Sequence, residues 1–166
     1  MKGTKLNETE STLGLFDFKE KLKSSTKFGH PKLRLSPLAA FTIFGQSSKT
    51  FYGLFDDKAF SLTTNSLAFL TPFILRGNYN NVNGKIKVKY IIEPRYKYQN
   101  IWSILLVVFP FVFFNFTFFS NKNALKIEYI FIYNSFLIFM VCFAIWNMST
   151  AKRKLEKDFI EIFKIR

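Results

Sequence analysis

The 166-residue chain combines 23 phenylalanines with a formal net charge of +13, which is unusual for a soluble domain of this length. Eleven of the phenylalanines lie in residues 101–148, and the remaining chain is too short to bury them in a soluble core. A single cysteine and a single histidine exclude an intrachain disulfide and a cysteine-based zinc site, so we expect no metal and no cofactor.

Two interpretations of the positive charge compete. A basic chain binds nucleic acid, or it is a membrane protein whose positive segments lie on the cytoplasmic side. The apolar runs are an independent signal for a membrane, and the basic residues are spread through the polar segments. The membrane interpretation is therefore preferred. The expected partners are then the anionic lipids of the inner leaflet and either a protein partner or further copies of this chain as a homo-oligomer. Neither nucleic acid nor a small-molecule substrate is expected.

Residues 1–36 are predicted to be a polar segment with one short helix. Leu15, Phe18 and Leu22 are spaced as a single helical stripe. This spacing favours a helix that packs on the following sheet. A helix lying on the membrane surface is the alternative, because three lysines occur within residues 19–23.

Residues 37–100 are predicted to form a cytosolic β-rich domain. The clearest strand is 85–92, KIKVKYII, where lysines alternate with apolar residues, as in a strand with one buried face. The adjacent Asn83 and Gly84 predict a tight hairpin turn. Short connections favour an antiparallel meander. The other candidate strands are residues 39–44, 50–55, 60–64 and 73–79.

Residues 101–148 contain two apolar runs, 101–119 and 127–148. Each is long enough, as a helix, to cross a hydrocarbon core of ~30 Å. The sequence therefore predicts a transmembrane hairpin of two helices. Within about 20 residues of this hairpin, eleven Lys and Arg residues flank it and two lie in its loop. The positive-inside rule then places both termini in the cytoplasm, with the hairpin in the inner membrane.

Residues 149–166 are predicted to form a basic amphipathic helix. Its apolar stripe is Leu155, Phe159, Ile162 and Phe163. The stripe lies on the bilayer, packs on the β-domain or pairs with a copy of itself, and packing on the β-domain is preferred. The expected fold class is thus an α+β membrane protein: an N-terminal antiparallel β-meander domain, a two-helix transmembrane hairpin and a C-terminal amphipathic helix.

No catalytic residue is predicted. Asp56 and Asp57 are adjacent carboxylates, but neighbours on a strand point to opposite faces, so an ordinary turn is favoured over a shared proton or metal. His30 has no Ser or Cys partner at a recognisable spacing. The sequence also contains no phosphate-binding, dinucleotide-binding or hydrolase motif.

Three residues inside the apolar runs have candidate roles. Asn115 and Asn134 are amides that need hydrogen-bond partners in lipid, so we expect them to join the two helices. The alternative is the polar lining of a pore. Pro110 removes one backbone hydrogen bond and is predicted to kink its helix.

Basic residues near the apolar runs are the candidate binding residues of the polar segments. Lys85, Lys87 and Lys89 fall on one face of a strand. This stripe is either a solvated face, protective if the strand is an edge, or a surface for anionic lipid or an acidic partner. The predicted lipid- or partner-binding residues are Lys85, Lys87, Lys89, Arg95, Lys97, Lys152, Arg153 and Lys154.

The order of several residues also carries a resemblance. They are Phe51-Tyr52-Gly53, Phe60, Asn65-Ser66, Pro72, Gly77, Gly84 and the KIKV run at 85–88. With a two-helix hairpin after it, this order resembles a loosely defined group of small, uncharacterised bacterial two-pass membrane proteins with an N-terminal β-rich domain. The resemblance covers residues 13–163 in layout and implies no activity. A further similarity, of plan alone, is to pleckstrin-homology-like domains attached to helix hairpins.

These observations favour a non-enzymatic, two-pass membrane protein, an accessory or scaffold whose β-domain binds a protein partner or the anionic membrane surface. The alternative is an oligomeric membrane-perturbing effector or small channel, in which Asn115, Asn134 and Thr117 line a wet path. Ion flux through reconstituted liposomes separates the two.

Overall fold

The computed structural model describes residues 6–31, 49–65, 72–120 and 127–166. The chain divides into two compact units, and each is described by itself. We call them the β unit, Met1–Arg95 with Ala151–Arg166, and the helical unit, Tyr96–Thr150.

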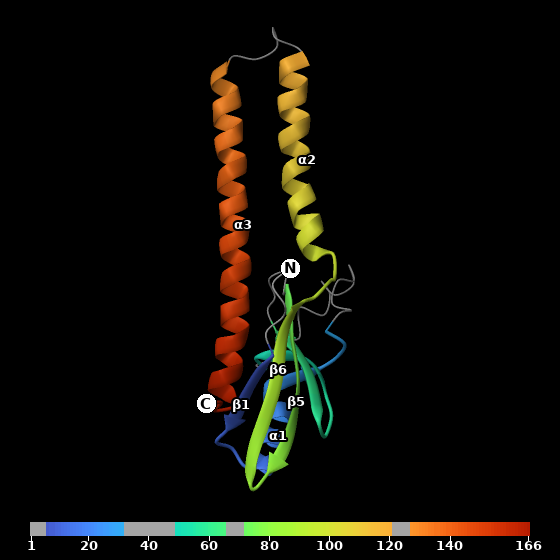
Figure 1. Ribbon diagram of the computed structural model, residues 1–166. Coiled ribbons are helices and arrows are strands. Elements are labelled where there is room, and N and C mark those ends of the chain that lie inside the picture. Colours follow the sequence, from blue (N-terminus) through green and yellow to red (C-terminus); the bar gives the residue numbers. More distant parts are fainter. Residues whose placement is uncertain (1–5, 32–48, 66–71, 121–126) are drawn as a thin grey trace. The chain divides into compact units, whose positions relative to one another are not determined.

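The β unit contains a six-stranded sheet in the order β1-β6-β5-β4-β3-β2, of which β1, β6 and β5 are labelled in Figure 1. All neighbouring strands are antiparallel except β2 and β3, which are parallel. The strands are β1 Asn7–Ser11, β2 Thr26–Phe28, β3 Phe51–Phe55, β4 Ala59–Thr64, β5 Phe73–Val82 and β6 Lys85–Pro94.

The centre of this sheet confirms the sequence prediction. Strands β3 to β6 follow one another as an antiparallel meander, close to the predicted bounds. In β6 the lysines are exposed and Ile86, Val88 and Tyr90 are buried. Asn83 and Gly84 form the two-residue turn before it, and both have positive φ angles (54° and 79°), as expected for an Asn-Gly hairpin. The strand predicted at 39–44 lies outside the described residues.

The edges of the sheet correct the prediction of a purely antiparallel meander. The polar N-terminal segment forms β1, the first strand in the chain, and β1 pairs with β6, the last strand in the chain. The three-residue β2 pairs parallel with β3, so the sheet is mixed. A meander has only short turns, whereas β2 and β3 are separated by residues 29–50, a length sufficient for the crossover that a parallel pair requires.

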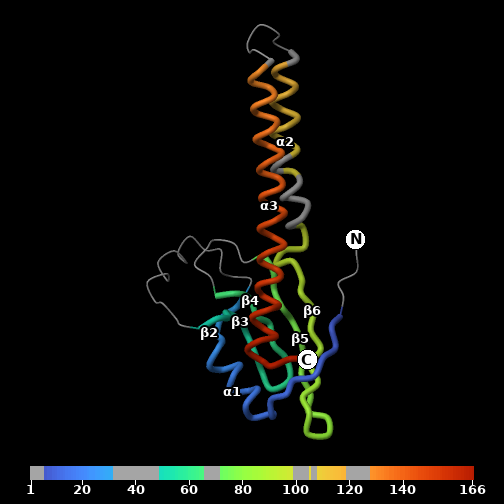
Figure 2. Tube along the Cα trace, turned by 90° about the vertical axis from the view of Figure 1, so that its left-hand side faces the viewer, coloured from blue at the N-terminus to red at the C-terminus, as the bar shows by residue number. Residues whose placement is uncertain are grey.

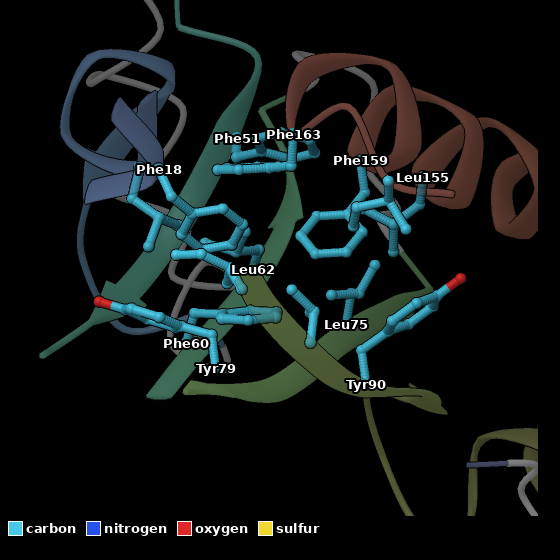
Figure 3. Packing of buried hydrophobic residues seen from close by; sticks show 14 of the residues in the cluster. Phe18, Phe51, Phe60, Leu62, Leu75, Tyr79, Tyr90, Leu155, Phe159 and Phe163 are labelled. Carbon is cyan, nitrogen blue, oxygen red and sulfur yellow. The ribbon is translucent and has the colours of Figure 1, made fainter. Parts of the chain in front are cut away.

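One face of the sheet is covered by two helical segments that share a core (Figure 3). Helix α1, Leu15–Ser25, contributes the buried Phe18 and Leu22, which confirms the predicted packing of this helix on the sheet. Its partner is the last part of α3, Ile127–Ile162.

Aromatic side chains from this last part of α3 fill the centre of the core. The Phe163 ring lies 4.8 Å from Phe18, and the Phe159 ring lies 5.3 Å from Phe60 and 5.2 Å from Tyr90, between ring centroids. Leu155 is also buried there. The prediction that the C-terminal stripe packs on the β-domain is therefore confirmed. The predicted tail helix is, however, the end of one continuous α3.

The chain end closes one edge of the sheet. Lys164 adopts a positive φ of 48° and terminates α3, after which Ile165 donates a backbone hydrogen bond to Ile160 O (3.0 Å). Arg166 and Glu10 then exchange backbone hydrogen bonds of 2.8 and 3.2 Å. The outer side of β1 is thus paired, which is one way that proteins protect an edge strand.

The helical unit contains α2, Gln99–Ser120, and the first part of α3, which lie side by side (Figure 2). Among the described residues, α3 alone, from Glu128 to Ile162, is long and apolar enough to cross a membrane. The apolar stretch described within α2, Val108–Phe118, spans only about half of a hydrocarbon core. The prediction of two transmembrane helices is therefore wrong for the described residues, among which one helix and not two is long and apolar enough to cross a membrane.

Candidate membrane-binding surface

The apolar part of α3 presents its side chains outward. None of the 18-residue window that qualifies this helix as a membrane span is buried. Phe131, Phe139 and Ile145 are exposed over 68%, 63% and 64% of their surface. A continuous apolar surface of this kind is rare on soluble monomers and marks contact with lipid or another protein. It is also unlike the core helix of a soluble protein, which is mostly buried.

The polar flank of this surface is strongly basic. Trp146 lies near the end of the apolar part and is 63% exposed. Lys152, Arg153 and Lys154 follow in the same helix and are all exposed. We call these three residues the collar. Apolar helix, aromatic ring and basic residues in this order match the layers of a membrane, from hydrocarbon to headgroups.

The structure brings Asn115 and Asn134 together. Each amide donates one hydrogen bond to the side-chain oxygen of the other, at 3.1 and 3.2 Å. Beside them, the rings of Phe114 and Tyr133 stack with centroids 3.7 Å apart. The amides therefore hydrogen-bond one another between α2 and α3, as expected for a helix contact.

Two further residues of α2 bear on the sequence predictions. Thr117 donates its hydroxyl hydrogen bond to carbonyls one turn back, Phe113 O and Phe114 O, both at 2.9 Å. Its hydroxyl is thus occupied within its own helix. Pro110 lies inside α2, where the helix continues on both sides, and the predicted kink stays a prediction.

The lysine stripe of β6, Lys85, Lys87 and Lys89, lies on the sheet face opposite the helices. Its neighbours on β1 are two glutamates. Lys89 forms an ion pair with Glu8, and Lys85 lies 3.6 Å from a carboxylate oxygen of Glu10. The register also places Lys87 directly opposite Glu10. Positive side chains of β6 therefore lie beside negative side chains of β1, and we call this arrangement the charge ladder. Strand β6 is an inner strand of the sheet, not an edge strand.

The two remaining predicted basic residues differ in exposure. Arg95 is only 5% exposed, so its guanidinium lies away from any surface that a headgroup reaches. Lys97 is exposed, and its ammonium lies 5.7 Å from the centroid of the Tyr98 ring, a cation–π distance.

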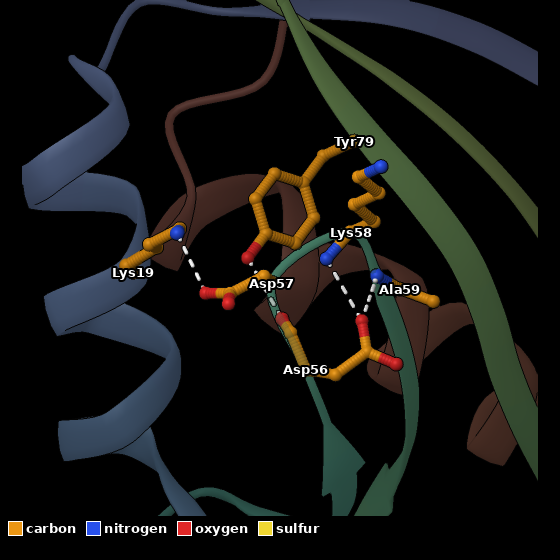
Figure 4. A network of polar contacts seen from close by, with 6 residues as sticks. All are labelled: Lys19, Asp56, Asp57, Lys58, Ala59 and Tyr79. Atoms are coloured by element: carbon orange, nitrogen blue, oxygen red, sulfur yellow. Dashed lines mark hydrogen bonds and ion pairs between the residues drawn. The ribbon is translucent and has the colours of Figure 1, made fainter.

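Asp56 and Asp57 occupy the turn between β3 and β4 (Figure 4). One Asp56 oxygen accepts backbone hydrogen bonds from Lys58 (2.8 Å) and Ala59 (2.7 Å), which lower the pKa of this carboxyl. The Lys19 ammonium donates to Asp57 at 2.7 Å, and this hydrogen bond raises the pKa of Lys19. The two carboxylates thus serve separate structural contacts, as the turn interpretation expected.

A shallow hollow of about 320 Å³ adjoins this turn, between α1 and the sheet. Its apolar floor includes Phe55 and Tyr79, and the Tyr79 hydroxyl donates to Asp56 O at 2.9 Å. Burial raises the pKa of this phenol. His30 is exposed and follows β2 in the chain. Among the described residues, no three His, Cys, Asp or Glu side chains are grouped to hold a metal ion.

Comparison of the chain with protein-family models, curated proteins and solved structures finds no match. The resemblance to small two-pass membrane proteins therefore stays a prediction. The site rests on the geometry of the chain's own residues.

Sequence reasoning missed the partners of the lysine stripe. Glu8 and Glu10 alternate with polar residues in NETES just as the lysines alternate in KIKVK. Two segments with period two and opposite charge are a signal for adjacent strands. The polar contact of Asn7, Tyr90 and Glu156 was missed as well, because it joins three elements distant in sequence.

Proposed function

We propose that this chain is a membrane-anchored, non-enzymatic accessory or scaffold protein. The apolar part of α3 inserts in the cytoplasmic membrane, α2 packs against it through the amide pair, and the β unit binds a protein partner in the cytoplasm. The observation that carries the proposal is the exposure of the apolar part of α3, which needs a nonaqueous surrounding.

The orientation is supported by the collar. Three consecutive basic residues follow the apolar part of α3, and basic residues near a membrane span favour the cytoplasmic side. The β unit comprises the chain before and after the helical unit, so both of these segments would then be cytoplasmic and α2, packed on α3, would lie in the membrane beside it.

The charge ladder favours a protein partner for the sheet face over the anionic membrane. Lys85 and Lys89 are paired with glutamates, and Arg76 lies 3.6 Å from Glu93, so the face carries both signs in near balance. A surface of mixed charge is attracted only weakly to a polyanion, but it can match the alternating charges of a protein.

The anchor is tested with the full chain by flotation. After alkaline washing, the wild-type protein should float with membrane vesicles in a density gradient. Replacing Ile138 and Phe139, 62% and 63% exposed, by Asp should remove most of it from the floating fraction. Each charge at the centre of a membrane helix costs about 3 kcal/mol.

The matched control is Ile160→Asp, at an exposed position of the same helix within the β unit. This variant should float like the wild type, because its charge meets water. Flotation separates inserted protein from aggregates, which sediment. Recovery of the wild type in the washed, soluble fraction would contradict the proposal.

A further inference from the structure

Two clusters of three basic residues lie on the surface of the described chain. The stripe, Lys85, Lys87 and Lys89, is on β6, and the collar, Lys152–Lys154, is on α3. Both carry three positive charges, and sequence reasoning gave both the same candidate role. The structure distinguishes them by what surrounds them.

The stripe has its counter-charges built in. Glu8 and Glu10 lie on the neighbouring strand, and the ion pairs Lys89–Glu8 and Lys85–Glu10 occupy two of the three lysines.

The collar differs in that none of its three side chains is in a close ion pair with a described carboxylate. No described carboxylate lies within 4.0 Å of its ammonium or guanidinium nitrogens. Glu156, the nearest acid in sequence, instead accepts hydrogen bonds from Tyr90 (3.2 Å) and Asn7 (3.4 Å). Asp158 lies one turn beyond Lys154; burial raises the pKa of its carboxyl, and the positive charge of Lys154 acts in the opposite direction, so Lys154 is offset in part at longer range.

The collar also lies at a defined distance from Trp146 along α3. Lys152 follows the exposed Trp146 by six residues, or ~9 Å along a helix axis. A tryptophan settles at the level of the glycerol and headgroup region. Consecutive helical residues point in directions ~100° apart, so the three side chains fan around the helix. This spread suits several separate headgroups better than one bound molecule.

We propose that the collar, and not the stripe, selects anionic phospholipids around the cytoplasmic end of α3 by contacting their phosphate groups. The inference rests on the proposed membrane insertion and adds the class of lipid and the residues that choose it. One unneutralised Lys or Arg near an anionic surface contributes roughly a fivefold preference.

Trp146 provides a local reporter for the test. The chain has two tryptophans, so Trp102→Phe leaves Trp146 alone. The full-length variant is reconstituted in vesicles that contain brominated phosphatidylglycerol, brominated phosphatidylcholine or mixtures of the two. Bromine quenches the fluorescence of an adjacent indole. The quenching in the mixtures gives the relative affinity of the anionic and zwitterionic lipids beside the collar.

We expect a preference for the anionic lipid of about fivefold, from one effective contact. It should fall to near one in the Lys152→Gln, Arg153→Gln, Lys154→Gln variant. The matched control, Lys85→Gln, Lys87→Gln, Lys89→Gln, removes the same number of charges and should keep the preference. In the unmutated collar, 1 M salt should also abolish it, because screening shortens to ~3 Å.

The outcomes separate the inference from the proposed function. Equal quenching by both lipids in the wild-type collar overturns the inference and leaves the membrane anchor standing. An equal loss in the stripe variant overturns it too, since net charge alone would then decide. The absence of quenching by either lipid places Trp146 outside the bilayer and contradicts the proposed function itself.

Discussion

Tyr90 is the residue at which sheet and helix share a polar contact. Its ring packs on Phe159 in the core, and its hydroxyl donates to Glu156 on α3 at 3.2 Å. Burial, with the negative charge of Glu156 as a second cause, raises the pKa of Tyr90 to about 12. The folded β unit therefore favours the neutral phenol over the phenolate.

This shift predicts a loss of stability at high pH. A tyrosine in the unfolded chain titrates near 10. The folded state keeps its proton up to about pH 12, so the stability from the neutral phenol is complete below pH 10. It declines as the pH rises from 10 to 12. The melting temperature of the wild type should fall more steeply across this window than that of Tyr90→Phe.

Circular dichroism melts of both proteins in detergent give the comparison. Lysine titration affects both equally and cancels in the difference between them. A difference in melting temperature that stays constant from pH 9 to pH 12 would show that the Tyr90 proton has no part in stability.

At this scale, sequence patterns predicted the buried positions of β6 and the turn role of Asp56 because both depend on near neighbours. They did not reveal that Glu8 and Glu10 neutralise the lysine stripe. That contact joins residues almost 80 positions apart, and its energy is small for each pair. Only the register of β1 on β6 makes it visible.

Among the elements, α2 and α3 are joined by a reciprocal amide pair. Asn115 and Asn134 each donate to and accept from the other. In an apolar surrounding, an amide that loses its partner retains the cost of an unsatisfied polar group. The pair therefore behaves as a unit that fixes how α2 is aligned along α3.

A double-mutant cycle tests this pair. Asn115→Leu or Asn134→Leu alone should each weaken the α2–α3 contact by about 1 kcal/mol. The double variant should cost less than the sum, because no amide is left unpaired. The measurement is the midpoint of unfolding in a titration with a denaturing detergent, followed by circular dichroism.

Thr117→Val serves as the control for this cycle. The Thr117 hydroxyl bonds carbonyls of its own helix, so its loss should leave the contact between helices unchanged. Strictly additive effects of the two leucine substitutions would show that the amides do not interact in solution.

The elements differ in how readily the sequence predicts them. Helix α1 and strands β3 to β6 carry apolar residues at helical or alternating spacing, and each was predicted. Strand β1, NETES, has no apolar residue and forms through pairing with β6 and the chain end. Strand β2 is three residues long and follows α1 directly, so no period is readable in it.

For the whole molecule, one helix has two environments. The end of α3 lies in the β-unit core with Leu155, Phe159 and Phe163, while its earlier apolar part is exposed. The length of the two apolar runs predicted two spans, whereas among the described residues α3 alone is long and apolar enough to cross a membrane. The phenylalanines of α3 therefore fall into two groups: one is buried in the core of the β unit, and the other lies on an exposed apolar surface whose contact with water is unfavourable.

The most direct test of the account is the depth of Cys142, the only cysteine, which is exposed within the apolar part of α3. A spin label there, in vesicles that contain the full chain, should collide more often with oxygen than with a water-soluble nickel chelate. A label moved to the exposed Lys157, in a Cys142→Ala background, should show the reverse. Greater access to nickel at Cys142, or shielding from both reagents, would contradict insertion of α3 in the bilayer.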